Sequence, residues 1–106
     1  MTPHVEILYV AGCPHNERAR ALVEHVAAEL QIAPTIELVE VPDAESAKEL
    51  RFFGSPTIRV NGRDVEPHAD RPYDFVLACR IYRGWRGTTG WPTSLWVREA
   101  LAEAVR

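Results

Sequence analysis

The sequence predicts a single α/β domain with a four-stranded mixed sheet and helices on both faces. The 106 residues are enough for one hydrophobic core and too few for two ordinary ones, so one domain should span residues 1–106. Strand-like and helix-periodic segments alternate through the first half of the chain, as they do in a βαβ unit. The turn pair Asn61-Gly62 then reverses the chain, which predicts an antiparallel hairpin. The expected order of elements is therefore βαβ-α-ββα, an α/β sandwich.

The first strand and the first helix are predicted on either side of a cysteine. Residues 5–10 are nearly continuous in apolar character, as a strand covered on both faces should be. Apolar residues then recur with helical period from Asn16 to Leu30. Pro14 suits the first helical position, because its ring fixes φ near the helical value and its missing N–H would have no partner there. We therefore expect the helix to begin just after Cys13.

The middle of the chain supplies a second strand, a short helix and a third strand. Residues 35–41 alternate as a strand with one face less buried. Asp43 suits the N-cap of a short helix over residues 44–53, which should stop before Gly54. Residues 57–60 form the third strand and lead into the Asn61-Gly62 turn.

The last third of the chain is predicted to hold one more strand and one more helix. Residues 64–73 are polar and without period, so we expect a loop containing at most a short continuation of the hairpin. Residues 75–82 alternate between apolar and other side chains, which predicts the fourth strand. A flexible, glycine-bearing loop should follow over residues 84–92, and residues 97–105 have the period of a terminal helix.

Composition and charge limit the class of partner. Apolar residues make up 46% of the chain and charged residues 25%, which is typical of a folded domain rather than a disordered one. The net charge of −3 is interspersed and forms no basic stripe, so we expect neither a nucleic-acid nor an anionic membrane partner. The start of the chain lacks a basic region followed by a long apolar one, and no stretch is long enough to span a bilayer. A cytoplasmic protein that binds a small molecule or another protein is expected.

The positions of the cysteines and histidines in this chain argue against a disulfide framework and against a metal site. Its two cysteines, Cys13 and Cys79, are too few for a disulfide-stapled scaffold and have no second pair to complete a thiolate zinc site. His4, His25 and His68 are scattered along the sequence, so no metal site and no resident cofactor are expected.

Cys13 is the candidate nucleophile. It is predicted to lie between a strand and a helix N-terminus, where backbone N–H groups lack partners and the helix dipole is positive. Such a position favours the thiolate, which is the form that attacks disulfides, peroxides and soft metals. His15 can add positive charge, and Asn16 can offer an amide donor to the sulfur. We expect Cys13 to be more exposed and more reactive than Cys79, which is expected to fill the core beside apolar neighbours.

Two short motifs resemble the thioredoxin-like superfamily in the expected order of elements. They are Cys13-Pro14-His15-Asn16 after the first strand and Ser55-Pro56-Thr57 before the third, and the resemblance extends from Val5 to the last helix. It implies a thiol–disulfide oxidoreductase with Cys13 as nucleophile. It also implies that the Ser55–Pro56 bond is cis and lies against Cys13. The residues that it implies for binding an extended thiol or peptide substrate are those of the two motifs: Pro14, His15, Asn16, Ser55, Pro56 and Thr57.

The sequence departs from the two-cysteine pattern of that family, because Asn16 stands where the second, resolving cysteine is found. A mixed disulfide at Cys13 would then be released by a low-molecular-weight thiol as co-substrate, or by Cys79 if the fold brings the two together. The expected partners are therefore a small thiol or a protein disulfide. The oligomeric state is left open.

Two other functions remain open from the residues alone. A non-catalytic member of the fold could bind a partner through the Cys13 surface or the tryptophan-bearing loop. The chain is also similar to small thioredoxin-like proteins labelled alkylmercury-lyase-like, in which a segment like Cys79-Arg80-Ile81-Tyr82 recurs. That similarity implies cleavage or binding of an organomercurial by Cys13 and Cys79 together with an acid. Asp70 and Asp74, which fall in or beside the predicted loop, give no clear assignment of that acid.

Overall fold

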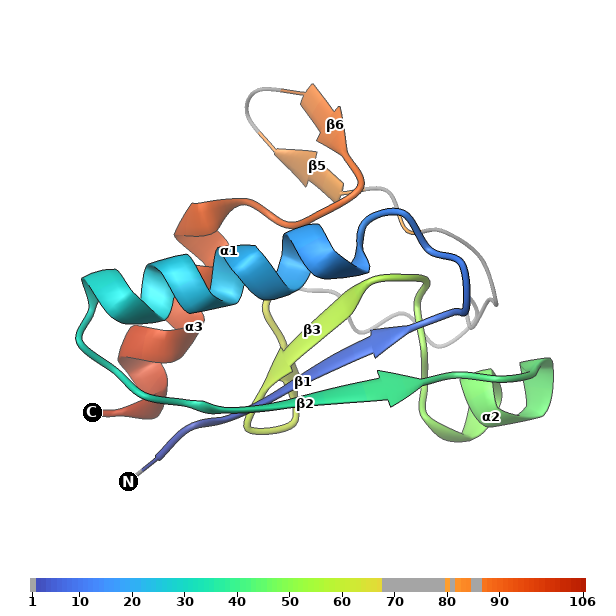
Figure 1. The fold of residues 1–106 in the computed structure, drawn as a ribbon, viewed down its shortest axis with the longest axis horizontal. Helices are drawn as coiled ribbons and strands as arrows, with labels where there is room; N and C mark the ends of the chain where they lie inside the picture. Colours follow the sequence, from blue (N-terminus) through green and yellow to red (C-terminus); the bar gives the residue numbers. More distant parts are fainter. Residues whose placement is uncertain (1, 68–79, 81, 85–86) are drawn as a thin grey trace.

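The structure is a computed structural model that describes residues 2–67, 80, 82–84 and 87–106 (Figure 1). The helices and strands, in chain order, are β1 (His4–Tyr9), α1 (Asn16–Glu29), β2 (Thr35–Glu40), α2 (Ala44–Glu49), β3 (Thr57–Val60), β4 (Arg63–Asp64), β5 (Tyr82–Gly84), β6 (Gly87–Thr89) and α3 (Ser94–Ala104). In this part of the chain, no helix is long and apolar enough to cross a membrane.

A four-stranded mixed sheet in the order β2-β1-β3-β4 confirms the predicted sheet type. β1 and β2 are parallel and are joined by the α1 crossover, whereas β3 runs antiparallel to both β1 and β4. Asn61 and Gly62 connect β3 to β4 with φ values of 51° and 83°. Both central residues of a two-residue type I′ hairpin turn need positive φ, so the predicted reversal at this pair is confirmed.

The alternation of side chains along β1 divides the sheet into two unlike faces. Val5 and Ile7 point toward α1 and α3 and join the main core, in which each fully buried aliphatic side chain contributes about 1.5–3 kcal/mol. Leu8 points to the other face and packs with Ala47 of α2 and with Phe52, three residues beyond the end of that helix. Figure 1 places α2 beyond the arrowheads of β1 and β2, so it covers that face only at the carboxyl end of the strands.

The fourth strand of the described sheet is the short continuation of the hairpin that the sequence allows at the start of the predicted loop. It is β4, Arg63–Asp64, which begins directly after the turn because a two-residue turn requires its partner strand there. Of the strand predicted over residues 75–82, residues 75–79 and 81 lie outside the described part. Arg80 is in no strand, and Tyr82 begins β5, which pairs with β6 in a separate two-stranded sheet. The loop predicted over residues 84–92 therefore contains a hairpin strand.

The ends of two helices also differ from the predictions. α1 begins at Asn16 with His15 as N-cap, so Pro14 lies two residues before the first helical position. The preceding loop is closed by a hydrogen bond from the Cys13 N–H to the Val10 carbonyl at 3.1 Å, which delays the helix. α2 stops at Glu49 rather than at residue 53, and the Phe52 N–H turns back to the Ala47 carbonyl at 2.8 Å.

Candidate functional site

Cys13 lies in the loop that leaves the central strand β1 and enters α1. Gly12 has a φ of +80°, a backbone conformation that favours glycine, and lets the chain turn before the cysteine. Cys13 is only 8% exposed, although its neighbours Gly12 and Pro14 are exposed. The thiol is therefore almost covered at the amino-terminal end of the helix. Cys79 lies outside the described residues, so the predicted order of exposure of the two cysteines stays a prediction.

The segment at the start of β3 lies beside the Cys13 loop. The Ser55–Pro56 bond is cis, as the family resemblance implies. Ser55 Oγ accepts a hydrogen bond from the Val10 N–H at 3.1 Å, and the Val10 carbonyl in turn accepts the bond from the Cys13 N–H. Val10 thus links the two predicted motifs through its own peptide groups. Contact between Pro56 and the Cys13 sulfur stays a prediction.

The predicted substrate-binding residues differ in exposure. Pro14 is exposed, and His15 and Asn16, at the N-cap and the first position of α1, are half-buried. The side chains of Ser55, Pro56 and Thr57 are buried, and Thr57 Oγ1 donates to the Gly54 carbonyl at 2.6 Å. Because all three side chains of the second motif are buried, a substrate there would have to contact the backbone of the motif or displace the residues that cover it.

His15 is held by a cluster that we call the Trp91 rim, made of His15, Arg18, Gly90 and Trp91. The His15 and Trp91 rings lie 5.5 Å apart between centroids, and the Arg18 guanidinium carbon lies 4.6 Å from the Trp91 ring centroid. A Cβ added to Gly90 would lie 2.3 Å from Cδ2 of His15, so the ring packs directly on the glycine backbone. The segment before α3 therefore braces the start of α1, a contact that the sequence pattern does not indicate.

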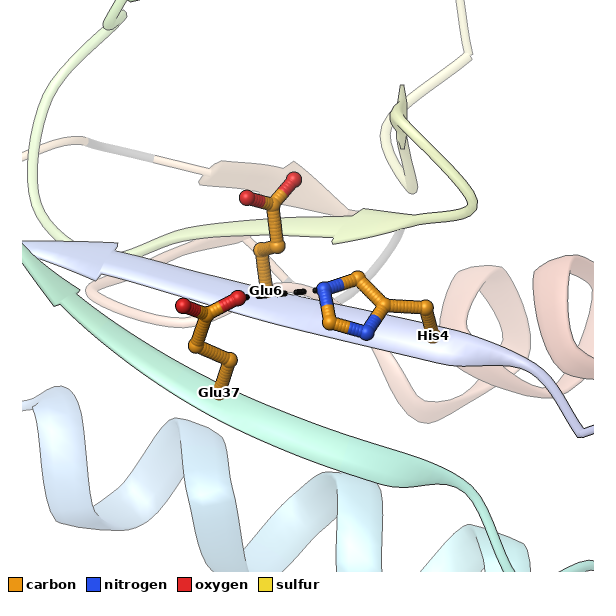
Figure 2. Close-up of side chains that lie close together, drawn as sticks. All are labelled: His4, Glu6 and Glu37. Atoms are coloured by element: carbon orange, nitrogen blue, oxygen red, sulfur yellow. Dashed lines mark hydrogen bonds and ion pairs between the residues drawn. The ribbon is translucent and has the colours of Figure 1, made fainter.

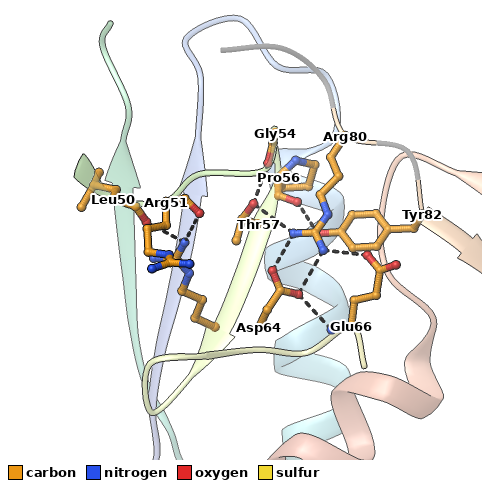
Figure 3. A network of polar contacts seen from close by, with 10 residues as sticks. Leu50, Arg51, Gly54, Pro56, Thr57, Asp64, Glu66, Arg80 and Tyr82 are labelled. Atoms are coloured by element: carbon orange, nitrogen blue, oxygen red, sulfur yellow. Dashed lines mark hydrogen bonds and ion pairs between the residues drawn. The ribbon is translucent and has the colours of Figure 1, made fainter. Parts of the chain in front are cut away.

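Arg80 is the centre of a buried polar network next to the same site (Figure 3). Its guanidinium donates to both carboxylate oxygens of Asp64 at 2.7 and 3.1 Å and to Glu66 at 2.6 Å. It also donates to Thr57 Oγ1 at 3.2 Å and lies 4.4 Å from the centroid of the Tyr82 ring. Bidentate arginine–carboxylate geometry of this kind is both strong and specific. Arg80 is only 6% exposed, so the network forms part of the interior.

The backbone around Arg80 ties the network to the second motif. The Arg80 N–H donates to the Ser55 carbonyl at 2.8 Å, and the Tyr82 hydroxyl donates to the Pro56 carbonyl. Burial by itself lowers the pKa of Arg80, but its interactions with Tyr82 and with the Asp64 and Glu66 carboxylates outweigh that effect and raise the pKa above its ordinary value. The guanidinium therefore stays charged and holds the start of β3 in place.

The sequence motifs account for only part of what the structure places near Cys13. The structure brings the Cys13 loop and Ser55 together, and it adds the Trp91 rim and the Arg80 network. His4, which the sequence pattern leaves isolated, lies 3.1 Å from Glu37 on the outer face of the sheet. Cys79, Asp70 and Asp74 lie outside the described residues.

A scan against protein-family models gives no match, and a search of curated proteins finds none with significant similarity.

We predict that Arg80→Met lowers the free energy of unfolding by about 3–5 kcal/mol, the usual cost of removing one partner from a buried ion pair. The change removes the cation that Asp64 and Glu66 share, and their side chains are only 11% and 15% exposed. Urea denaturation followed by circular dichroism at neutral pH measures the effect. Arg98→Met is the matched control, because Arg98 is 41% exposed and bonds to Glu29 on the surface, where a pair contributes roughly 0–1 kcal/mol. Equal losses in the two variants would contradict the prediction.

We also predict that stability falls as pH rises above about 10, the ordinary pKa of tyrosine, because of Tyr82. Burial raises the pKa of Tyr82; Arg80 opposes this, and Asp64 and Glu66 add to it. The folded protein therefore keeps a proton that the unfolded chain releases, which costs about 1.4 kcal/mol per pH unit above that value.

Urea denaturation at several pH values between about 9 and 11 tests this expectation. Tyr82→Phe should remove most of the alkaline decline, although it also removes the hydrogen bond to Pro56 and lowers stability at every pH. Tyr9→Phe, in β1, is the control and should keep the decline. A Tyr82→Phe protein that loses stability as steeply as the wild type would show that Tyr82 is not the group responsible.

Proposed function

We propose that this protein is a thioredoxin-like thiol–disulfide oxidoreductase that acts mainly through Cys13. The observation that carries the proposal is the link through Val10, which holds the Cys13 loop and Ser55 side by side at the ends of two adjacent strands. The cysteine also lies just before the first turn of α1, which is the position that the family resemblance implies for the nucleophile. This arrangement supports a nucleophile beside the start of β3, where an extended substrate would take the place of the Arg80 N–H on the Ser55 carbonyl.

The sheet topology supports the same proposal. The order β2-β1-β3-β4, with a parallel crossover through α1 and an antiparallel hairpin, is compatible with a thioredoxin-like architecture. It adds to the resemblance of the two motifs, which occupy the loop after β1 and the start of β3. We further propose that the protein acts in the cytoplasm, where low-molecular-weight thiols are kept reduced.

The reaction that we propose is thiol–disulfide exchange. The Cys13 thiolate attacks one sulfur of a disulfide, forming a mixed disulfide while the bond between the two substrate sulfurs breaks. The other substrate sulfur leaves as a thiolate and takes a proton from water. A low-molecular-weight thiol then attacks the substrate sulfur of the mixed disulfide. This step releases the Cys13 thiolate and leaves the substrate joined to the small thiol by a new disulfide bond. Asn16 has no sulfur to perform this second step within the protein.

The burial of Cys13 favours one alternative, a non-catalytic protein of the same fold. Cys13 is 8% exposed, so a catalytic role requires the surrounding loop to move aside before the thiol can react. A cysteine that only fills the core needs no such movement and is unreactive. The thiol's reactivity therefore separates the two functions directly.

We predict that oxidised glutathione forms a persistent mixed disulfide at Cys13, detectable by intact-mass measurement and absent in Cys13→Ser. Protein disulfides should be reduced slowly, because no neighbouring thiol resolves the adduct. Asn16→Cys places a thiol in the first turn of α1 and should speed protein-disulfide reduction by about tenfold or more, since an intramolecular step gains a high effective concentration. Asn16→Ser is the control and should leave the rate low.

The same measurement, together with an assay of hydrocarbon release from an organomercurial, decides between the alternatives. Cys79→Ser is included because Cys79 directly precedes Arg80, whose N–H bonds to Ser55. An adduct that persists in wild type and in Cys79→Ser supports the single-thiol reaction. Collapse to an internal Cys13–Cys79 disulfide in the wild type would make Cys79 the resolving thiol. An unreactive Cys13 would favour the binding protein, and release of hydrocarbon from an organomercurial would favour the lyase.

A further inference from the structure

Three side chains with metal-binding atoms lie together on the outer face of the sheet, opposite α1 (Figure 2). His4 and Glu6 both come from β1, where residues two apart point to the same face. The parallel register places Glu37 of β2 beside Glu6. One nitrogen or carboxylate oxygen from each of the three residues lies within 4.8 Å of the other two.

We propose that His4, Glu6 and Glu37 form a zinc-binding site. Zinc bound by one imidazole and two carboxylates has bond lengths of roughly 2.0–2.2 Å, which in a tetrahedral site places the ligand atoms about 3.3–3.6 Å apart. His4 Nε2 and Glu37 Oε1 are already 3.1 Å apart, and a carboxylate oxygen of Glu6 lies within 4.8 Å of both residues' ligand atoms. The imidazole favours zinc over magnesium or calcium, which prefer all-oxygen sites. Three protein ligands leave the fourth position for water.

The backbone that carries His4 is fixed on both sides, although it stands at the beginning of β1. The His4 N–H donates to Asn61 Oδ1 at 2.9 Å, and the Asn61 N–H donates to the His4 carbonyl at 2.8 Å. On the other side, the Thr35 N–H of β2 donates to the Pro3 carbonyl at 2.9 Å. Ligands held on such paired strands need little reordering when an ion binds.

The charges around the cluster are suited to a divalent cation. Two carboxylates and a neutral imidazole supply a formal charge of −2, which matches that of zinc. Arg59 is the cross-strand neighbour of Glu6 and interacts with its carboxylate, so its charge opposes a cation there. Its guanidinium also donates to the carbonyl oxygens of Leu50 and Arg51 at 2.7 and 2.8 Å, which fixes it just beyond the end of α2. The side chains of His4 and Glu37 are 46% and 56% exposed, so an ion can enter from solvent.

Zinc titration of the untagged protein against a chromophoric chelator tests the proposal. One zinc ion per chain should bind at this site, and His4→Gln should weaken its binding by about 100-fold, because loss of a direct ligand costs at least as much as loss of a residue that supports one. Glu37→Gln and Glu6→Gln should each weaken it by about tenfold or more. His25→Gln is the matched control, since His25 also faces a glutamate, Glu29 at 3.6 Å, on the exposed side of α1.

Cys13→Ser separates this site from zinc bound by thiolates, and it should retain the His4-dependent binding. Equal affinities in His4→Gln and His25→Gln, or loss of all binding in Cys13→Ser, would overturn the proposal. Circular dichroism checks that each variant is folded. Should a variant unfold, NMR of the wild type decides, because zinc must shift the imidazole signals of His4 and leave those of His25 in place.

Discussion

The rest of the structure depends on the buried ion pair between Arg80 and the carboxylates of Asp64 and Glu66. A carboxylate near the interior is costly unless a cation and hydrogen bonds compensate it, so these residues must remain together in the folded state. Because Arg80 belongs to the chain beyond the sheet and Asp64 to β4, the pair ties that later segment to the sheet edge. Thr57 and Tyr82 complete the same network, which therefore also holds the start of β3.

A continuous series of hydrogen bonds leads from that ion pair to the candidate nucleophile. The Arg80 N–H bonds to the Ser55 carbonyl, the Ser55 hydroxyl to the Val10 N–H, and the Val10 carbonyl to the Cys13 N–H. Each bond contributes only about 0.5–1.5 kcal/mol to stability, but together they leave the loop little freedom. The Trp91 rim adds a second support from the other side of the α1 N-terminus. The position of the thiol is thus determined by residues far along the chain.

Local sequence patterns predicted those parts of the fold that depend on near neighbours. The first three strands, the α1 crossover and the Asn61-Gly62 turn follow from alternation, helical period and turn chemistry, and the cis Ser55–Pro56 bond followed from the family resemblance. The strand predicted over residues 75–82 does not include Arg80, because alternation does not reveal that its side chain bonds to carboxylates 14 and 16 residues away; residues 75–79 and 81 lie outside the described part. His4 and Glu37 are 33 residues apart, so only the parallel register brings them together.

The six residues of β1 separate two chemistries at its two ends. The His4 imidazole and the carboxylates of Glu6 and Glu37 gather along the first half of the strand, and the thiol lies beyond its end. At about 3.3 Å per residue, the strand continues for roughly 10 Å after Glu6, so an ion on these ligands is too far from the Cys13 sulfur to be bound by it. A metal ion at the proposed zinc site would therefore not be a ligand partner of the Cys13 sulfur of the same chain, so the two proposed activities use separate sets of atoms.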